Sequence, residues 1–208
     1  MDKGLKDPDR AVRLQALSDL GTVREPQLRP ALESLLKSGD EQLAELGAFA
    51  LGRLGTKESL PVLQALSANT PGHVRIAADE AASRLGDAAA RRRLQELLEV
   101  TDQRTRQRAA SALCELGDEK GKALLKSAIA NADPQAESTR AVLRQLCRAG
   151  DKDAQAKLRG LLQQKSQPEV VLQAAADLSA AGDPEARELL RKLAQSPGPE
   201  QLIAARVL

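Results

Sequence analysis

Residues 73–87 read HVRIAADEAASRLGD, and this stretch decides the fold. Its small and aliphatic residues recur at steps of three and four, which places them on one face of a helix. Gly86 suits the left-handed residue at which many helices end, and Asp87 suits the cap of a following helix. The stretch therefore predicts one helix that ends at Gly86 and a second helix that begins directly after Asp87.

The same ending recurs along the chain at a nearly constant interval. Successive glycines are separated by 34, 31, 31, 33 and 32 residues, and the six positions are Gly21, Gly55, Gly86, Gly117, Gly150 and Gly182. A fixed period of this length is typical of a solenoid. We expect each repeat to be a hairpin of helix A, which ends at the glycine, and helix B, which follows. One hairpin cannot bury its own apolar face, so neighbouring repeats must stack to form a core.

The repeat spans nearly all of the 208 residues, and the sequence contains no Trp, no Tyr and one Phe. The remainder is rich in strong helix formers. We therefore predict a single all-α domain over residues 1–208, a right-handed α–α superhelix of six hairpins and a terminal helix. The expected repeats are 5–38, 39–69, 70–100, 101–132, 133–166 and 167–196, with a partial seventh at 197–208.

The pattern Asp-Pro-x-x-Val-Arg, followed by Ala-x-x-Leu-x-x-Leu-Gly-Asp, resembles HEAT repeats of the phycobilisome-lyase-like type. It is clearest in residues 73–87 and 105–118. Arg10, Arg75 and Arg106 share one position, eleven residues before the glycine, and the resemblance implies that this arginine braces adjacent repeats. The other repeats depart from the pattern with Ala44, Thr139 and Val171. The resemblance implies an architecture and says little about activity.

Charge and hydropathy exclude several classes of protein. The net charge is +2, which is too weak for the concentrated basic face of a nucleic-acid-binding protein. No apolar run approaches the length of a membrane span, and the first residues lack the apolar segment of a signal peptide. We expect a soluble cytoplasmic protein without membrane contact.

Residues for catalysis, cofactors and metals are scarce. Repeat proteins that resemble deoxyhypusine hydroxylase bind iron through repeated His-Glu pairs, and this chain has one histidine, His73. No aromatic or histidine cluster suggests a bilin site. Cys114 and Cys147 each lie three residues before a glycine, where other repeats have Ser or Gly, so we interpret them as small packing residues without a disulfide. We predict a non-enzymatic protein with no cofactor and no metal.

Charge along the repeats gives the best indication of a binding site. At nine residues after each glycine, repeats two to six have Gln64, Gln95, Lys126, Arg159 and Arg191, with Lys192 beside the last and Glu33 at the offset position of repeat one. We expect helix B to line the concave side, so these residues would form a groove that is basic at its C-terminal end. The hypothesis is that this end binds an acidic segment of a partner protein. Charges that merely keep the surface soluble, or nucleic-acid binding along the same groove, are the alternatives.

Two further features suggest contacts with other molecules. Phe49 lies on the predicted solvent-facing side of helix A, where a lone aromatic side chain is a plausible contact residue. It could instead fold against its neighbours. The partial seventh repeat carries Ile203 and Val207, and no helix B follows to cover them. That helix either packs flat as a lid or meets another molecule, which includes self-association through this end.

Overall fold

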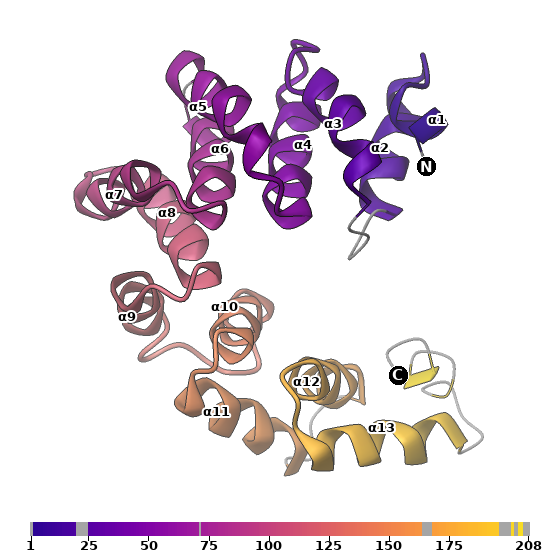
Figure 1. Ribbon diagram of the computed structural model, residues 1–208. Coiled ribbons are helices and arrows are strands. Elements are labelled where there is room, and N and C mark those ends of the chain that lie inside the picture. The colour runs from indigo at the N-terminus through magenta and orange to yellow at the C-terminus, as the bar shows by residue number, and fades with distance from the viewer. Residues whose placement is uncertain are drawn as a thin grey trace. The chain divides into compact units, whose positions relative to one another are not determined.

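The computed structural model describes residues 2–19, 25–70, 72–163, 168–195, 201, 204 and 205. Within these residues every regular element is a helix (Figure 1). The elements come in chain order as α1 Asp2–Leu5, α2 Arg10–Asp19, η1 Pro26–Leu28, α3 Arg29–Leu35, α4 Glu41–Leu54, η2 Lys57–Ser59, α5 Leu60–Asn69, α6 Gly72–Arg84, α7 Ala88–Glu96, η3 Leu97–Glu99, α8 Gln103–Glu115, α9 Glu119–Ala128, α10 Glu137–Arg148, α11 Lys152–Gln163, α12 Pro168–Ala180 and α13 Pro184–Gln195. The predicted all-α solenoid of helical hairpins is confirmed. Helices A are α2, α4, α6, α8, α10 and α12.

Helix A ends where the sequence predicts. The glycines of repeats two to six all have positive φ, from 73° to 102°, which is the left-handed region that favours glycine. Gly21 lies outside the described residues. The next residue caps helix B in repeats three to six, because the Oδ1 atoms of Asp87, Asp118, Asp151 and Asp183 accept backbone N–H groups of the helix that follows.

Two helices A begin in different ways. The cap of α8 is Asp102, which accepts the N–H of Thr105. In repeat five, Asp133 accepts the N–H of Gln135 within a separate turn, and α10 begins later, at Glu137. A side-chain cap thus marks the start of α8, whereas α10 follows Ala136, which makes no side-chain cap bond.

The repeated apolar positions form the core. The residue four before each glycine is buried in all six repeats, as Leu17, Leu51, Ala82, Leu113, Leu146 and Leu178. The leucine eight after the glycine is buried in repeats two to six, as Leu63, Leu94, Leu125, Leu158 and Leu190. Small residues allow neighbouring helices A to approach closely. A Cβ on Gly52 would lie 2.8 Å from the Cα of Ala81 in the next helix A.

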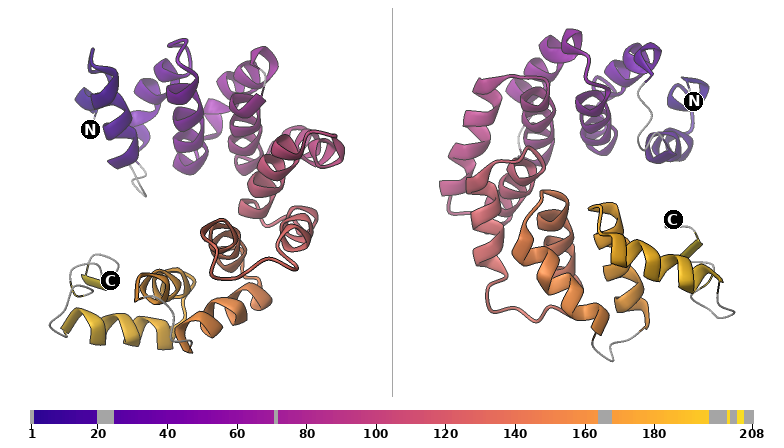
Figure 2. Two further views of the ribbon diagram at one scale, coloured as in Figure 1. Left: turned by 180° about the vertical axis from the view of Figure 1, so that it is seen from behind. Right: turned by 60° about the horizontal axis from the view of Figure 1, so that its bottom comes forward.

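Within each hairpin stack the helices form two layers (Figure 1, Figure 2). In residues 1–121, α4 packs against α6 and α6 packs against α8, while α5 and α7 pack on the other side of α6. These helices A lie on the inner side of the bend of this part of the chain, and α3, α5 and α7 lie on its outer side. The expectation that helix B lines the concave side is therefore wrong there.

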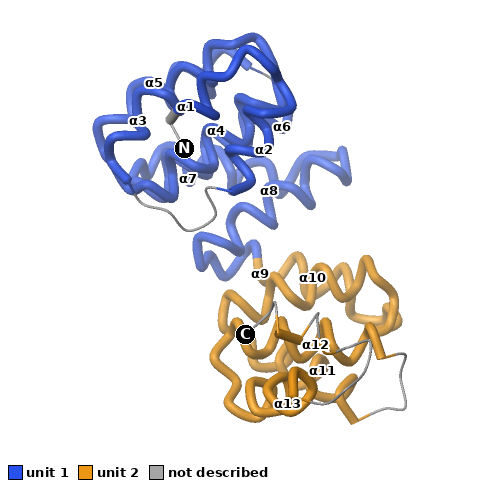
Figure 3. The backbone as a smooth tube through the Cα atoms, turned by 90° about the vertical axis from the view of Figure 1, so that its right-hand side faces the viewer, with its two compact units in different colours: residues 1–121 blue, residues 122–208 orange. Residues whose placement is uncertain are grey.

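The chain divides into two compact units, residues 1–121 (unit 1) and residues 122–208 (unit 2), which are coloured separately in Figure 3. Unit 1 contains the first three repeats, helix α8 and the start of α9. Unit 2 contains the rest of α9 and the hairpins α10–α11 and α12–α13. Each unit has its own buried core, and the single continuous domain stays a prediction.

Candidate protein-binding site

The residue nine after the glycine bonds the aspartate that caps helix B of the next repeat. Four consecutive bonds have this form, and each ends on the Oδ2 atom of that aspartate. They are Gln64 to Asp87 at 2.9 Å, Gln95 to Asp118 at 2.8 Å, Lys126 to Asp151 at 3.0 Å and Arg159 to Asp183 at 2.7 Å. We call these four acceptors the brace aspartates. One carboxylate oxygen caps its own helix and the other joins it to the preceding repeat.

Two residues of the predicted basic groove therefore have acidic partners within the chain. Lys126 donates to Asp151 and also to Asp153, at 2.6 Å, and these two bonds raise its pKa to about 12. Arg159 holds Asp183 through Nε and through its terminal nitrogen, at 2.7 and 2.5 Å. Their predicted role in binding a partner stays a prediction, but much of their charge is already compensated.

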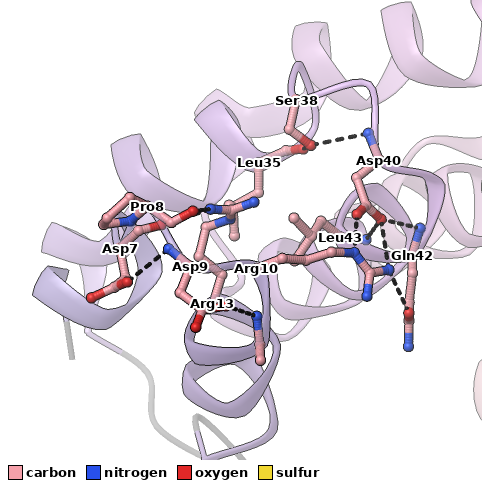
Figure 4. Close-up of polar contacts among 11 residues, drawn as sticks. Asp7, Pro8, Asp9, Arg10, Arg13, Leu35, Ser38, Asp40, Gln42 and Leu43 are labelled. Atoms are coloured by element: carbon pink, nitrogen blue, oxygen red, sulfur yellow. Dashed lines mark hydrogen bonds and ion pairs between the residues drawn. The ribbon is translucent and has the colours of Figure 1, made fainter.

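The arginines eleven residues before the glycine do not share one role. Arg10 bonds Asp40 and Gln42 at the start of the next helix A, and its bond lowers the pKa of Asp40 to about 2 (Figure 4). Arg106 instead donates to the carbonyl groups of Val100 and Thr101 just before its own helix, at 2.7 and 2.9 Å. The inter-repeat brace that the resemblance implies is present at Arg10 and is replaced by a local cap at Arg106.

Arg75 lies beside a buried carboxylate, Asp79, whose side chain is fully enclosed. Arg93 and Ser67 donate to Asp79 Oδ1, at 2.6 Å for the closer arginine nitrogen and at 2.7 Å for the hydroxyl. Arg75 Nε is 3.8 Å from Oδ2. This buried charge therefore joins α5, α6 and α7 within unit 1, because Ser67 lies on α5 and Arg93 on α7.

Unit 2 has a groove that is lined by three arginines and one acid. Arg148 from α10 and Arg187 and Arg191 from α13 line it, together with Gln173, Ala176, Asp177, Ser179 and Ala180 from α12, and its volume is about 610 Å³. Arg144 bonds the Asp177 carboxylate at 2.9 Å, so that acid is already neutralised. Among the described residues no ion pair holds Arg148 or Arg187. We call the groove that Arg148, Arg187 and Arg191 line the arginine groove.

Arg191 differs from its counterparts in the earlier repeats. Its side chain is 60% exposed, and its nearest carboxylate in the described part of the chain is Glu188 of its own helix, at 3.8 Å. Lys192, predicted to join it, also lies on α13 and is exposed. The structure thus brings Arg191 together with two arginines that the sequence reading missed. Repeat spacing alone could not find them, because Arg148 and Arg187 occupy different repeat positions.

Unit 1 carries a different kind of surface. Within the described part of the chain, three large hydrophobic side chains are exposed to solvent. They are Val12 on α2 and Leu46 and Phe49 on α4, with exposed fractions of 40, 37 and 40%. Val12 and Leu46 occupy the same repeat position, nine before the glycine, on two helices that pack together. Phe49 follows one helical turn after Leu46, and Arg53 lies over its ring, 5.6 Å from the centroid. We call these three hydrophobic residues the apolar strip.

Charged residues border the strip on the same layer of helices A. Glu45 on α4 lies 3.7 Å from Nε2 of His73 on α6 and 3.3 Å from Arg108 on α8. These contacts connect three consecutive helices A. The prediction that Phe49 faces solvent is confirmed, and its role in binding stays a prediction.

The cysteines behave as the sequence predicts. Cys114 and Cys147 are both buried and both free of a disulfide. Burial raises the pKa of Cys147 to about 11, and the charge of Asp177 acts in the same direction. In the described parts of the chain no three His, Cys, Asp or Glu side chains form a group that could hold a metal ion. No described helix is long and apolar enough to cross a membrane.

The predicted contacts of the seventh repeat cannot be placed, because Ile203 and Val207 lie outside the described residues. Ala204 is described, and it packs in the core of unit 2 with Leu172, Ala175 and Leu190. The end of the chain therefore contributes at least this residue to the core formed by α12 and α13.

Comparison with known proteins supports the repeat architecture. The model of the family of HEAT repeats matches residues 3–83 and 127–208. A chain in the complex of CpcE and CpcF of phycocyanin lyase from Nostoc sp. PCC7120 aligns with a TM-score of 0.58 at 21% identity, over 99% of this chain and 79% of that one. Human deoxyhypusine hydroxylase aligns with a TM-score of 0.41 at 20% identity, over 99% of this chain and 81% of that one. No curated protein matches the sequence.

Proposed function

Because the chain belongs to the family of HEAT repeats, we propose that it is a non-enzymatic scaffold that binds a partner protein through helices A of unit 1. The apolar strip is the observation that carries this proposal. Scattered exposed hydrophobic residues are normal on a protein surface, whereas exposed apolar residues gathered on adjacent elements mark interaction sites. Val12, Leu46 and Phe49 are gathered on two neighbouring helices.

The strip can contribute a measurable part of the binding free energy. Complete burial of such a side chain contributes roughly 1.5–3 kcal/mol, and about two fifths of each is still exposed. Burying the rest of all three residues would therefore contribute about 2–4 kcal/mol, which is a change of roughly 30-fold to 1,000-fold in affinity. Arg53, stacked on Phe49, adds a cation at the edge of the same surface.

The layer of helices A also suits this role because contacts between neighbouring repeats hold its helices in place. Arg10 on α2 bonds Asp40 and Gln42 at the start of α4. Leu17 and Leu51 of these two helices are also buried in one core, so the strip lies on a preformed surface. A preformed site pays less ordering entropy on binding than a flexible one. The earlier hypothesis of a groove lined by helix B gives way here to a surface formed by helices A.

Photo-cross-linking in a cell lysate tests the proposal. A photoreactive benzoylphenylalanine at position 49 should cross-link a partner protein, and the same group at the exposed Ala88 on α7 is the matched control. The substitutions V12S and L46S should remove the cross-link at position 49 without loss of folding, because both side chains are exposed. If positions 49 and 88 yield the same products, or if V12S/L46S leaves the product unchanged, the proposal is wrong.

A further inference from the structure

We propose that the arginine groove of unit 2 binds a segment of a partner protein that carries several carboxylates. The inference adds a second contact to the proposed scaffold and rests on its binding of protein, although the two surfaces lie in different units. Its evidence is charge. Residues 122–208 have 13 basic and 10 acidic side chains, and Arg148, Arg187 and Arg191 line one groove with a single acid, Asp177, while Glu188 lies 3.8 Å from Arg191.

Two other grooves in the molecule show what compensated charge looks like. The groove of about 640 Å³ between α9, α10 and α11 has Lys126 and Lys157 on its rim, with Asp151 and Asp153 beside them. The groove of about 390 Å³ near α5 and α7 has Arg75 and Arg93, which face Asp79 and Asp87. In both, the acidic side chains equal the basic ones in number. The arginine groove has three cations, and its one acid is held by Arg144.

The repeat explains why the charge is available at this place. In repeats two to five the residue nine after the glycine donates a hydrogen bond to a brace aspartate of the next repeat. Arg191 occupies that position in repeat six, and no aspartate of a following repeat lies among the described residues. A carboxylate supplied by a partner would satisfy Arg191 as Asp183 satisfies Arg159. Arg187, one turn earlier on α13, and Arg148 from α10 would hold further carboxylates.

Arginine favours this kind of ligand for a geometric reason. Its planar guanidinium presents two parallel N–H groups to a carboxylate, and it stays charged at any physiological pH. Because the three side chains come from two helices, they can hold carboxylates that are not adjacent in a peptide. The inferred partner is therefore an acidic segment, and the same charges are the reason to include nucleic acid in the test.

A defined probe tests the groove without a known partner. A fluorescein-labelled peptide of alternating Glu and Ser is titrated with the full chain by fluorescence anisotropy, and a peptide of alternating Gln and Ser is the neutral control. We expect the acidic peptide to bind, and the variant R148E/R187E/R191E to bind it about tenfold more weakly or worse. Affinity should fall between about 0.05 and 0.2 M NaCl, because exposed charges are screened.

A variant with the same change in net charge serves as the matched control. R92E/R104E/K152E reverses three exposed cations outside the groove and should stay within about twofold of the wild type. Circular dichroism checks that both variants fold. If the reversed groove fails to fold, R148Q/R187Q/R191Q against R92Q/R104Q/K152Q makes the same comparison.

Three results would overturn the inference. They are no binding of the acidic peptide, equal loss in both triple variants, or a random single-stranded oligonucleotide that binds the groove more tightly than the peptide does. The third would assign the groove to nucleic acid. The variant V12S/L46S separates this inference from the proposed scaffold surface, since it should bind the acidic peptide as the wild type does.

Discussion

Replacing Asp183 by alanine tests whether the brace aspartates hold the repeats together. Asp183 is almost fully buried, its Oδ1 accepts the N–H of Ala186 at 3.0 Å, and its Oδ2 accepts from Arg159. The substitution D183A removes both bonds at once. The substitution D183N keeps an oxygen for the N–H of Ala186 and removes the charge that Arg159 holds, so the two variants separate the cap from the brace.

The expected magnitudes follow from these contacts. Loss of an N-cap costs about 0.5–2 kcal/mol. The pair with Arg159 adds about 0.2–1 kcal/mol, a value kept low because the side chain of Arg159 is 50% exposed. We therefore expect D183A to destabilise unit 2 by about 1–3 kcal/mol and D183N by less than about 1 kcal/mol. D153A is the matched control, because Asp153 is 75% exposed and should cost no more than about 0.5 kcal/mol.

Urea unfolding followed by circular dichroism measures these differences as shifts in the midpoint at constant slope. If D183N costs as much as D183A, the cap contributes nothing and the reasoning fails. It also fails if D183A lies within the error of D153A.

The contacts of Asp183 should also make the free energy of unfolding depend on pH. Burial alone would raise the pKa of Asp183, but the bonds from Ala186 and Arg159 outweigh it, and the pKa is lowered. A carboxyl group with a lowered pKa stabilises the fold above its unfolded pKa of about 4, and this stabilisation is lost as the pH falls. The stability difference between the wild type and D183N should therefore shrink between pH 7 and pH values below about 4. A difference that grows on acidification would contradict the argument.

Two further predictions concern packing. The substitution G52A should destabilise unit 1 by about 1–3 kcal/mol, because its Cβ would lie 2.8 Å from the backbone of Ala81, whereas G160A has no atom within 4 Å and should stabilise α11 by up to about 1 kcal/mol. Thermal unfolding compares the two, and equal effects would show that the helices A do not approach as described. Cys114 and Cys147 should react with a thiol reagent only on unfolding, since both are buried and the pKa of Cys147 is about 11. Rapid reaction of the native chain would contradict their burial.

Much of the fold follows from local rules that act within one repeat. A glycine that ends a helix, an aspartate that caps the next and leucines at fixed offsets each depend on neighbours a few residues away. The spacing therefore predicted the hairpins and the exposure of Phe49. Spacing does not register the turn after Asp133 that precedes α10.

The site was harder to predict because it depends on how one repeat faces the next. Whether Lys126 points to solvent or to Asp151 is decided by the rotation of helix B against the following hairpin, which no single repeat encodes. One signal was available in the sequence. A donor such as Gln64 and the aspartate that follows the next glycine recur together, separated by 23 residues in Gln64–Asp87 and 25 in Lys126–Asp151.

The change of residue type along this position has a physical explanation in the brace itself. In repeats three to six the aspartate caps helix B, and its second oxygen can accept from any hydrogen-bond donor. Gln64, Gln95, Lys126 and Arg159 all meet that need, so an increase in positive charge along the chain requires no partner while an aspartate follows. The same charge has a different consequence at Arg191, where the nearest described acid is a weakly placed Glu188. This repeat position is therefore structural in repeats two to five, and in repeat six we infer that Arg191 binds a carboxylate of the partner.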